Sequence, residues 1–184
     1  MILKEMSLIA LAIFFSSGFL IETEFNFGKD KMGNDWEVIN DGVMGGLSKG
    51  KIEMTENTLK FSGSISLDNY GGFTSVKSPF TKIDLSNSKK VKIRYRTKNQ
   101  SVAISLENSK EFYKPYFKMN LANTNNEWKT VDRSINEFKE NKLGQETSTQ
   151  ISSKFLESVQ RIGLITSQKK EGDFTVEIDY IKFE

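Results

Sequence analysis

Two arginines stand two residues apart in a segment that alternates apolar and polar side chains. The alternation covers residues 91–96 and is typical of a strand with one buried face. Arg94 and Arg96 then lie on the polar face, about 7 Å apart along the strand. Two guanidinium groups at this spacing can bind neighbouring anionic or hydroxyl groups, because each presents a planar fork of donors. Tyr113 and Tyr116 would add aromatic surface to this ligand site; an ordinary solvated strand face is the alternative.

A glycine-rich segment between Trp36 and Ser48 raises the question of phosphate binding. Its glycines, at positions 42, 45 and 46, do not have the spacing of a dinucleotide-binding loop, and no Ser or Thr follows the next Gly-Lys pair as a Walker A loop requires. A tight turn is the better interpretation. Its glycines supply positive φ values, and Asp41 and Ser48 hydrogen-bond to the backbone across it. For Asp41, catalysis or calcium binding is the alternative.

The residue types that the chain lacks narrow the chemistry further. None of the 184 residues is Cys or His, which excludes disulfides, thiolate and imidazole metal sites, and the Ser-His-Asp triad. The net charge is +2, from 26 basic and 24 acidic residues without a long run of one sign, so nothing indicates nucleic-acid binding. We expect binding without catalysis and without a cofactor or metal; an enzyme would have to use paired carboxylates.

The first 18 residues have the features of an export signal. The uncharged stretch 6–21 is shorter than the ~20 residues that a membrane-spanning helix needs. Ser16 and Gly18 are small residues at the spacing that signal peptidases read. We therefore expect residues 1–18 to be removed and residues 19–184 to form one domain outside the cytoplasm, periplasmic or secreted. An uncleaved membrane anchor is the alternative.

Alternation with a period of two dominates the chain after residue 22. The clearest strands cover residues 91–97, 102–106 and 174–180. Shorter candidates cover residues 52–54, 59–61, 65–67, 73–77, 117–119, 128–131 and 162–165. The alternation changes phase at Ile181 and Phe183, which indicates a β-bulge or burial on both faces.

Helix signals are few. Ser152 can cap a short helix over residues 153–160, and residues 135–139 can form a single turn. The polar stretch 140–150 is expected to be a mobile loop. About ten short strands with so little helix predict an all-β fold, a two-sheet antiparallel jelly-roll sandwich.

A set of motifs in order resembles the complex I intermediate-associated protein 30 family. Its opening signature matches Trp36, Asp41, Val43, Met44, Gly45, Gly46 and Ser48, and its N-x-GGF turn matches Asn69, Gly71, Gly72 and Phe73. Its closing strand matches residues 172–181. The resemblance implies a galactose-binding-domain-like jelly roll. Nine loop residues are expected to have a structural role rather than to bind a ligand: Trp36, Asp41, Met44, Gly45, Gly46, Ser48, Gly71, Gly72 and Phe73.

The resemblance also implies a binding or assembly module. The mitochondrial member of the family is an assembly factor for respiratory complex I, with no established catalysis, whereas an exported chain would not reach the matrix or cytoplasmic arm of that complex. A protein partner is the expected ligand, and carbohydrate binding in the cell envelope is the alternative. A membrane is expected to take part only if the leader is uncleaved. Trp36 and Trp128 are expected to be core residues, and sugar-stacking platforms are the alternative.

Overall fold

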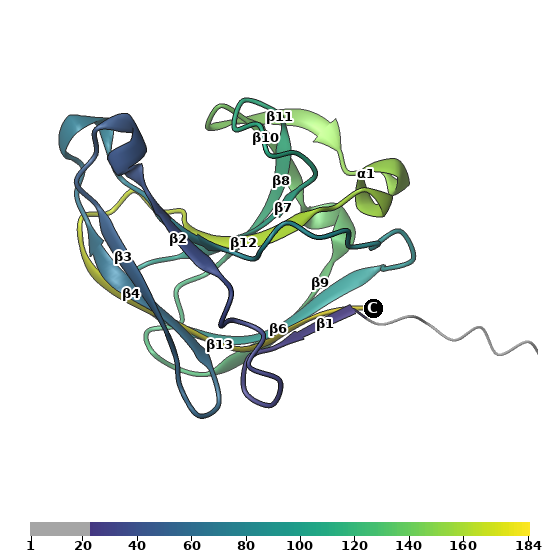
Figure 1. The fold of residues 1–184 in the computed structure, drawn as a ribbon, viewed down its shortest axis with the longest axis horizontal. Helices are drawn as coiled ribbons and strands as arrows, with labels where there is room; N and C mark the ends of the chain where they lie inside the picture. Colours follow the sequence, from purple (N-terminus) through teal and green to yellow (C-terminus); the bar gives the residue numbers. More distant parts are fainter. Residues whose placement is uncertain (1–22) are drawn as a thin grey trace, which may run out of the picture.

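The computed structural model describes residues 23–184, which form two facing antiparallel β-sheets (Figure 1). Sheet A has the strand order β3-β4-β13-β6-β9, with β1 also paired to β13, and sheet B has the order β11-β10-β8-β7-β12-β5-β2. The two-sheet antiparallel sandwich expected from the sequence is confirmed. The expected signal peptide, residues 1–18, lies outside the described residues. From residue 23 onward, no helix has the length and apolar character needed to cross a bilayer.

The strands have the following bounds. Sheet A consists of β1 (Thr23–Asn26), β3 (Lys49–Met54), β4 (Leu59–Ile65), β6 (Lys90–Lys98), β9 (Lys129–Ser134) and β13 (Gly172–Phe183). Sheet B consists of β2 (Glu37–Asn40), β5 (Thr74–Lys77), β7 (Val102–Glu107), β8 (Tyr116–Leu121), β10 (Lys139–Lys142), β11 (Gln145–Gln150) and β12 (Arg161–Thr166). The helical elements are the 3-10 turns η1 (Asp41–Met44), η2 (Asp68–Tyr70) and η3 (Ile135–Glu137), and the helix α1 (Ser153–Glu157).

The core lies between the sheets and is filled by the apolar positions of the alternating strands. The predicted core residues Val91, Ile93, Tyr95, Val102, Ile104, Phe174, Val176 and Ile178 are all buried. Trp36 belongs to the same core, with its ring edge-on to Phe27 at 5.2 Å between centroids. Because each strand buries alternate residues, the residues between them form the outer faces of the sandwich.

A β-bulge interrupts β13 at the point where the sequence changes phase. The register with β6 shifts between Ile178 and Tyr180, which leaves Asp179 as the extra residue. The carbonyl oxygen of Asp179 accepts a hydrogen bond from the Phe27 N–H at 2.9 Å. The core face resumes at Ile181, which is fully buried. The predicted bulge is therefore confirmed, and it keeps the end of the strand in the core.

Two local predictions are corrected. Residues 140–150 are not a loop, because β10 and β11 pair as a hairpin across Leu143 and Gly144, whose φ values of 50° and 81° are typical of a type I′ turn. Helix α1 does start after Ser152, whose hydroxyl accepts a hydrogen bond from the Phe155 N–H, but it ends at Glu157.

Sheet B is strongly curved. In Figure 1 strands β8, β10 and β11 rise away from sheet A at one end, and the loops that carry η1 and η2 rise at the other. The outer face of sheet B is therefore concave between these two raised ends.

Candidate functional site

The structure separates the two pairs of residues that the sequence suggested as one ligand site. Arg94 and Arg96 lie on β6 in sheet A, whereas Tyr116 begins β8 in sheet B and Tyr113 precedes it in the loop. The arginines alternate with core residues such as Tyr95, and Tyr116 precedes the buried Phe117. The two groups therefore face opposite outer surfaces of the sandwich.

Arg94 and Arg96 form a closed cluster with two acids of β13 and with Trp128. Arg94 Nη1 lies 2.5 Å from Asp179 Oδ2, and Arg96 Nη2 lies 2.7 Å from Glu177 Oε1. Both guanidinium groups also stack on the Trp128 ring, at 4.5 and 5.0 Å from its centroid. A cavity of about 560 Å³ borders Arg94 and Trp128. An anion entering it would compete with carboxylates that already bind both arginines.

The glycine-rich segment and the N-x-GGF turn are joined by the Asp41 carboxylate. Its Oδ1 accepts a hydrogen bond from the Ser48 N–H at 2.9 Å, and its Oδ2 accepts from the N–H groups of Gly72 at 2.8 Å and Phe73 at 3.3 Å. Asp41 is only 1% exposed. Burial raises its pKa, but the hydrogen bonds from Ser48, Gly72 and Phe73 outweigh burial, so the pKa lies below its ordinary value. We call these four residues the Asp41 clasp.

Glycines make room for the clasp. A Cβ at position 46 would lie 2.4 Å from Asp41 Cγ, and a Cβ at position 71 would lie 2.7 Å from Asp41 Oδ2. Gly45 ends η1 with a φ of 91°, a left-handed conformation that disfavours side chains. The residues that carry the family resemblance thus position two loops at the rim of the concave face.

A row of six residues crosses the concave face from β2 to β10. Strand register pairs its members in the order Glu37, Lys77, Gly163, Ser105, Lys118 and Lys139. Directly paired residues of antiparallel strands point to the same side of a sheet. Ser105 stands between the fully buried Ile104 and Leu106, so this side is the outer, concave one. We call these six residues the concave row.

The centre of the concave row contains a buried hydroxyl group without a partner. Lys77 on β5 reaches across β12 to Glu107 on β7, with 2.6 Å between Nζ and Oε1. Gly163 permits this crossing, because a Cβ there would lie 2.7 Å from Ser105 Oγ and 3.0 Å from Lys77 Cγ. Ser105 Oγ is buried beside the lysine stem and has no hydrogen-bond partner within residues 23–184. Leaving such a group unpaired costs about 1–3 kcal/mol.

Tyr116 and Lys118 continue the concave face on β8. Burial raises the pKa of the Tyr116 hydroxyl, and the charge of Glu107 raises it further. Burial lowers the pKa of Lys118; Glu146 acts against this shift, and Lys169 adds to it. Tyr116 therefore lies within electrostatic range of Glu107, and two lysines lie within range of each other.

Two carboxylates of the concave face are paired with cations. Glu107 pairs with Lys77, and Glu37 pairs with Arg161, whose Nε also donates to the Ser78 carbonyl at 2.8 Å. In the part of the chain that the structure describes, no three acidic side chains are grouped as a metal site. The face thus offers hydrogen-bonding groups rather than a free pair of carboxylates.

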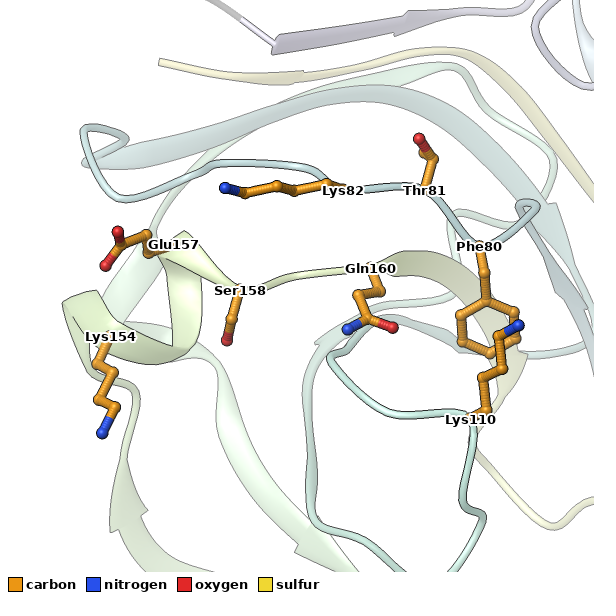
Figure 2. A pocket seen from close by; sticks show the side chains of 8 residues that line it. All are labelled: Phe80, Thr81, Lys82, Lys110, Lys154, Glu157, Ser158 and Gln160. Atoms are coloured by element: carbon orange, nitrogen blue, oxygen red, sulfur yellow. The ribbon is translucent and has the colours of Figure 1, made fainter.

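A separate cavity of about 600 Å³ lies beside α1 and the start of β12 (Figure 2). It is lined by Phe80, Thr81, Lys82, Lys110, Lys154, Glu157, Ser158 and Gln160. In Figure 2 Lys82 extends towards Glu157, whereas Lys154 points away from Ser158. Lys110 lies over the Phe80 ring, 5.3 Å from its centroid. The three ammonium groups do not converge, so the cavity holds no preformed anion site.

Exposed apolar side chains lie on the loops that the Asp41 clasp joins. Leu47, Leu67 and Tyr70 are 54%, 46% and 100% exposed. The loops meet where Ser48 Oγ donates to the Ser66 carbonyl at 3.2 Å. We call these three residues the apolar rim, since they stand at the edge of the concave face.

Comparison with known proteins identifies the family and structures with a similar fold. The family model for Complex I intermediate-associated protein 30 matches residues 25–178, and no curated protein matches the chain. A family 11 carbohydrate-binding module from Clostridium thermocellum, solved in complex with a β-1,3-1,4-mixed-linked tetrasaccharide, superposes with a TM-score of 0.62 and 18% identity. The match covers 88% of this chain and 94% of the module. The agarase AgWH50C superposes with a TM-score of 0.56 and 10% identity, over 89% of this chain and 24% of the agarase.

Proposed function

The chain belongs to the complex I intermediate-associated protein 30 family, and we propose that it is a non-catalytic module that binds a carbohydrate on the concave face of sheet B. The observation that carries the proposal is the unpaired Ser105 hydroxyl at the centre of the concave row. Buried hydroxyl groups almost always have partners, so a ligand group is the natural partner here. The Lys77 side chain, 21% exposed and paired with Glu107, borders this hydroxyl on the concave face.

The surroundings of Ser105 suit a sugar chain. Sugars combine hydroxyl edges with apolar ring faces, and small-ligand sites combine apolar lining with a few placed polar groups. Ile39 and Ile165 are half-buried outer residues opposite Ser75 in the strand register, and Tyr116 supplies a half-buried aromatic ring. The shared fold with a module solved in complex with a tetrasaccharide supports the same ligand class.

Binding without turnover follows from the charges on this face. Glycoside hydrolysis uses one carboxylic acid and one free carboxylate on either side of the bond. Glu37 and Glu107 are each engaged by a cation instead. The chain also contains no His or Cys that could act as an alternative base or nucleophile.

Replacing Ser105 by alanine should weaken carbohydrate binding without lowering the stability of the fold. We expect the free energy of unfolding to stay the same or rise, because an unpaired buried hydroxyl is removed. The affinity for the carbohydrate found on a glycan array should fall about tenfold, as expected for one lost hydrogen bond. Isothermal titration and urea unfolding measure the two quantities.

Ser75 provides the matched control on the same face. Its hydroxyl donates to the Ile39 carbonyl at 3.1 Å, so Ser75→Ala should lower stability where Ser105→Ala does not. Folded wild-type protein that binds nothing across the array would refute the carbohydrate function. Steady hydrolysis of a bound glycan would refute the non-catalytic one.

The apolar rim favours a protein partner as the second candidate function. Exposed apolar groups of this kind often mark protein-binding surfaces. Replacing Leu67 and Tyr70 by serine should abolish the capture of a specific partner in pull-downs from the native source. Leu143→Ser, at a turn residue that is 65% exposed, is the control and should retain the partner. Equal recovery with both variants would exclude the apolar rim.

A further inference from the structure

One end of the concave row carries a surplus of positive charge. Lys118 on β8 is paired in register with Lys139 on β10, and like charges opposite each other on neighbouring strands are destabilising. Lys169, in the loop after β12, lies close enough to lower the pKa of Lys118. Glu146 is the acid that acts on Lys118 in the opposite direction. Lys118 thus has one cation opposite it on β10 and a second, Lys169, within electrostatic range.

None of these lysines is held by a carboxylate at ion-pair distance. The ion pairs among residues 23–184 engage Lys77, Lys90, Arg94, Arg96, Lys114, Arg133 and Arg161 instead. Burial lowers the pKa of Lys118, because desolvation disfavours the charged ammonium, and the charge of Glu146 does not outweigh this effect. Arg94 and Arg96, by contrast, are neutralised by two acids of β13.

Lys169 is held in a conformation that lysine rarely adopts. Its φ is 46°, in the left-handed region that costs about 1–2 kcal/mol for a residue with a side chain. Its Cγ lies 3.7 Å from the point where a Cβ of Gly72 would stand, so its stem lies beside the Asp41 clasp. Strained residues of this kind cluster at ligand sites. The clasp and the strained loop together position Lys169 at the rim of the face.

We propose that the carbohydrate bound by the concave face is an anionic polysaccharide, with an acid group held between Lys118 and Lys169 and a neighbouring oxygen bonded to Ser105. Ser105 is the direct register partner of Lys118, so their Cβ atoms are about 5 Å apart. An acid group between two like charges relieves their repulsion and gains charge-assisted hydrogen bonds. A neutral sugar would bury Lys118 further and supply no counter-charge. This inference rests on the proposed carbohydrate-binding function.

The test compares three soluble polymers by titration against the purified protein: polygalacturonate, chondroitin sulfate and neutral mixed-linked β-glucan. We expect an anionic polymer to bind at least about tenfold more tightly than the glucan. A preference for polygalacturonate identifies a carboxylate as the acid group, and a preference for chondroitin sulfate identifies a sulfate. Binding should weaken as NaCl is raised, because exposed charges are screened.

Charge-removing variants locate the site. Lys118→Gln and Lys169→Gln should each reduce the affinity for the anionic polymer about tenfold, whereas Lys118→Arg should retain most of it. Lys82→Gln and Lys154→Gln in the separate cavity remove the same charge elsewhere and should change the affinity less than about twofold. Melting temperatures show which variants remain folded.

The outcomes distinguish this inference from the function on which it rests. Equal binding of the neutral glucan and the anionic polymers overturns the anionic preference and leaves carbohydrate binding intact. Failure to bind any carbohydrate overturns both. Equal losses for Lys118→Gln and Lys82→Gln would show a general electrostatic attraction and would remove the acid group from the concave face.

Discussion

Replacing Asp41 by alanine should lower the free energy of unfolding by about 3 kcal/mol, because three backbone N–H groups, two of them in buried hydrogen bonds, lose their acceptor together. These are the N–H groups of Ser48, Gly72 and Phe73. The loss also releases two loops from each other, so the effect should exceed that of one hydrogen bond. Urea unfolding at pH 7 measures it. Asp35→Ala, at an exposed acid, is the control and should change stability by less than about 0.5 kcal/mol.

The pH dependence identifies the charged form of Asp41 as the stabilising one. Its folded pKa is lowered, so its contribution is fully present above the unfolded pKa of about 3.9. The contribution is lost as the pH falls through the lower, folded pKa. The difference in stability between wild type and Asp41→Ala should therefore be constant above about pH 5 and shrink below about pH 4. A difference that stays constant down to pH 2 would contradict the role of the carboxylate.

Replacing Gly63 by alanine should be at least as damaging. Gly63 on β4 pairs directly with Gly50 on β3, and a Cβ at position 63 would lie 1.9 Å from the Lys49 carbonyl oxygen. The clashing atom belongs to the backbone and cannot rotate away as a side chain could, so β3 must move away from β4. We expect a loss of about 3 kcal/mol or more, and a melting temperature lower by roughly 10 °C for a domain of this size.

Gly42 supplies the control for Gly63. It has open space around the position of its missing Cβ, so Gly42→Ala should melt close to wild type. An unchanged melting temperature in Gly63→Ala would show that the two strands separate without cost. That result would contradict the close approach of their backbones.

The sequence predicted the strands whose alternation is long and regular, and it missed the polar hairpin of β10 and β11. The alternation in β6, β7 and β13 is regular because their core residues meet the opposite sheet, and the change of phase at Ile181 revealed the bulge. β10 and β11 are polar on both faces at the edge of sheet B, so periodicity gave no signal for them. Their turn at Leu143 and Gly144 carried the available clue, a glycine at a position with positive φ.

The candidate site was harder to predict because it depends on register between strands that are distant in the sequence. Lys77, Ser105 and Gly163 come from β5, β7 and β12, and nothing local indicates that they form a row. One signal was present in β7, where the polar-face positions of the alternation hold the small residues Ala103 and Ser105. Both are buried, which shows that this strand is covered on its outer face too.

The position of β13 within sheet A has a consequence for how the chain folds. This strand pairs with β1, β4 and β6, yet it is synthesised after all three of them. Thr23 meets Phe183 in that register, so β1 cannot pair until all the other strands have been synthesised. Contacts at such separation close slowly. Until they do, β1, β4 and β6 each have an unpaired edge, and unpaired edges are prone to non-native pairing and aggregation.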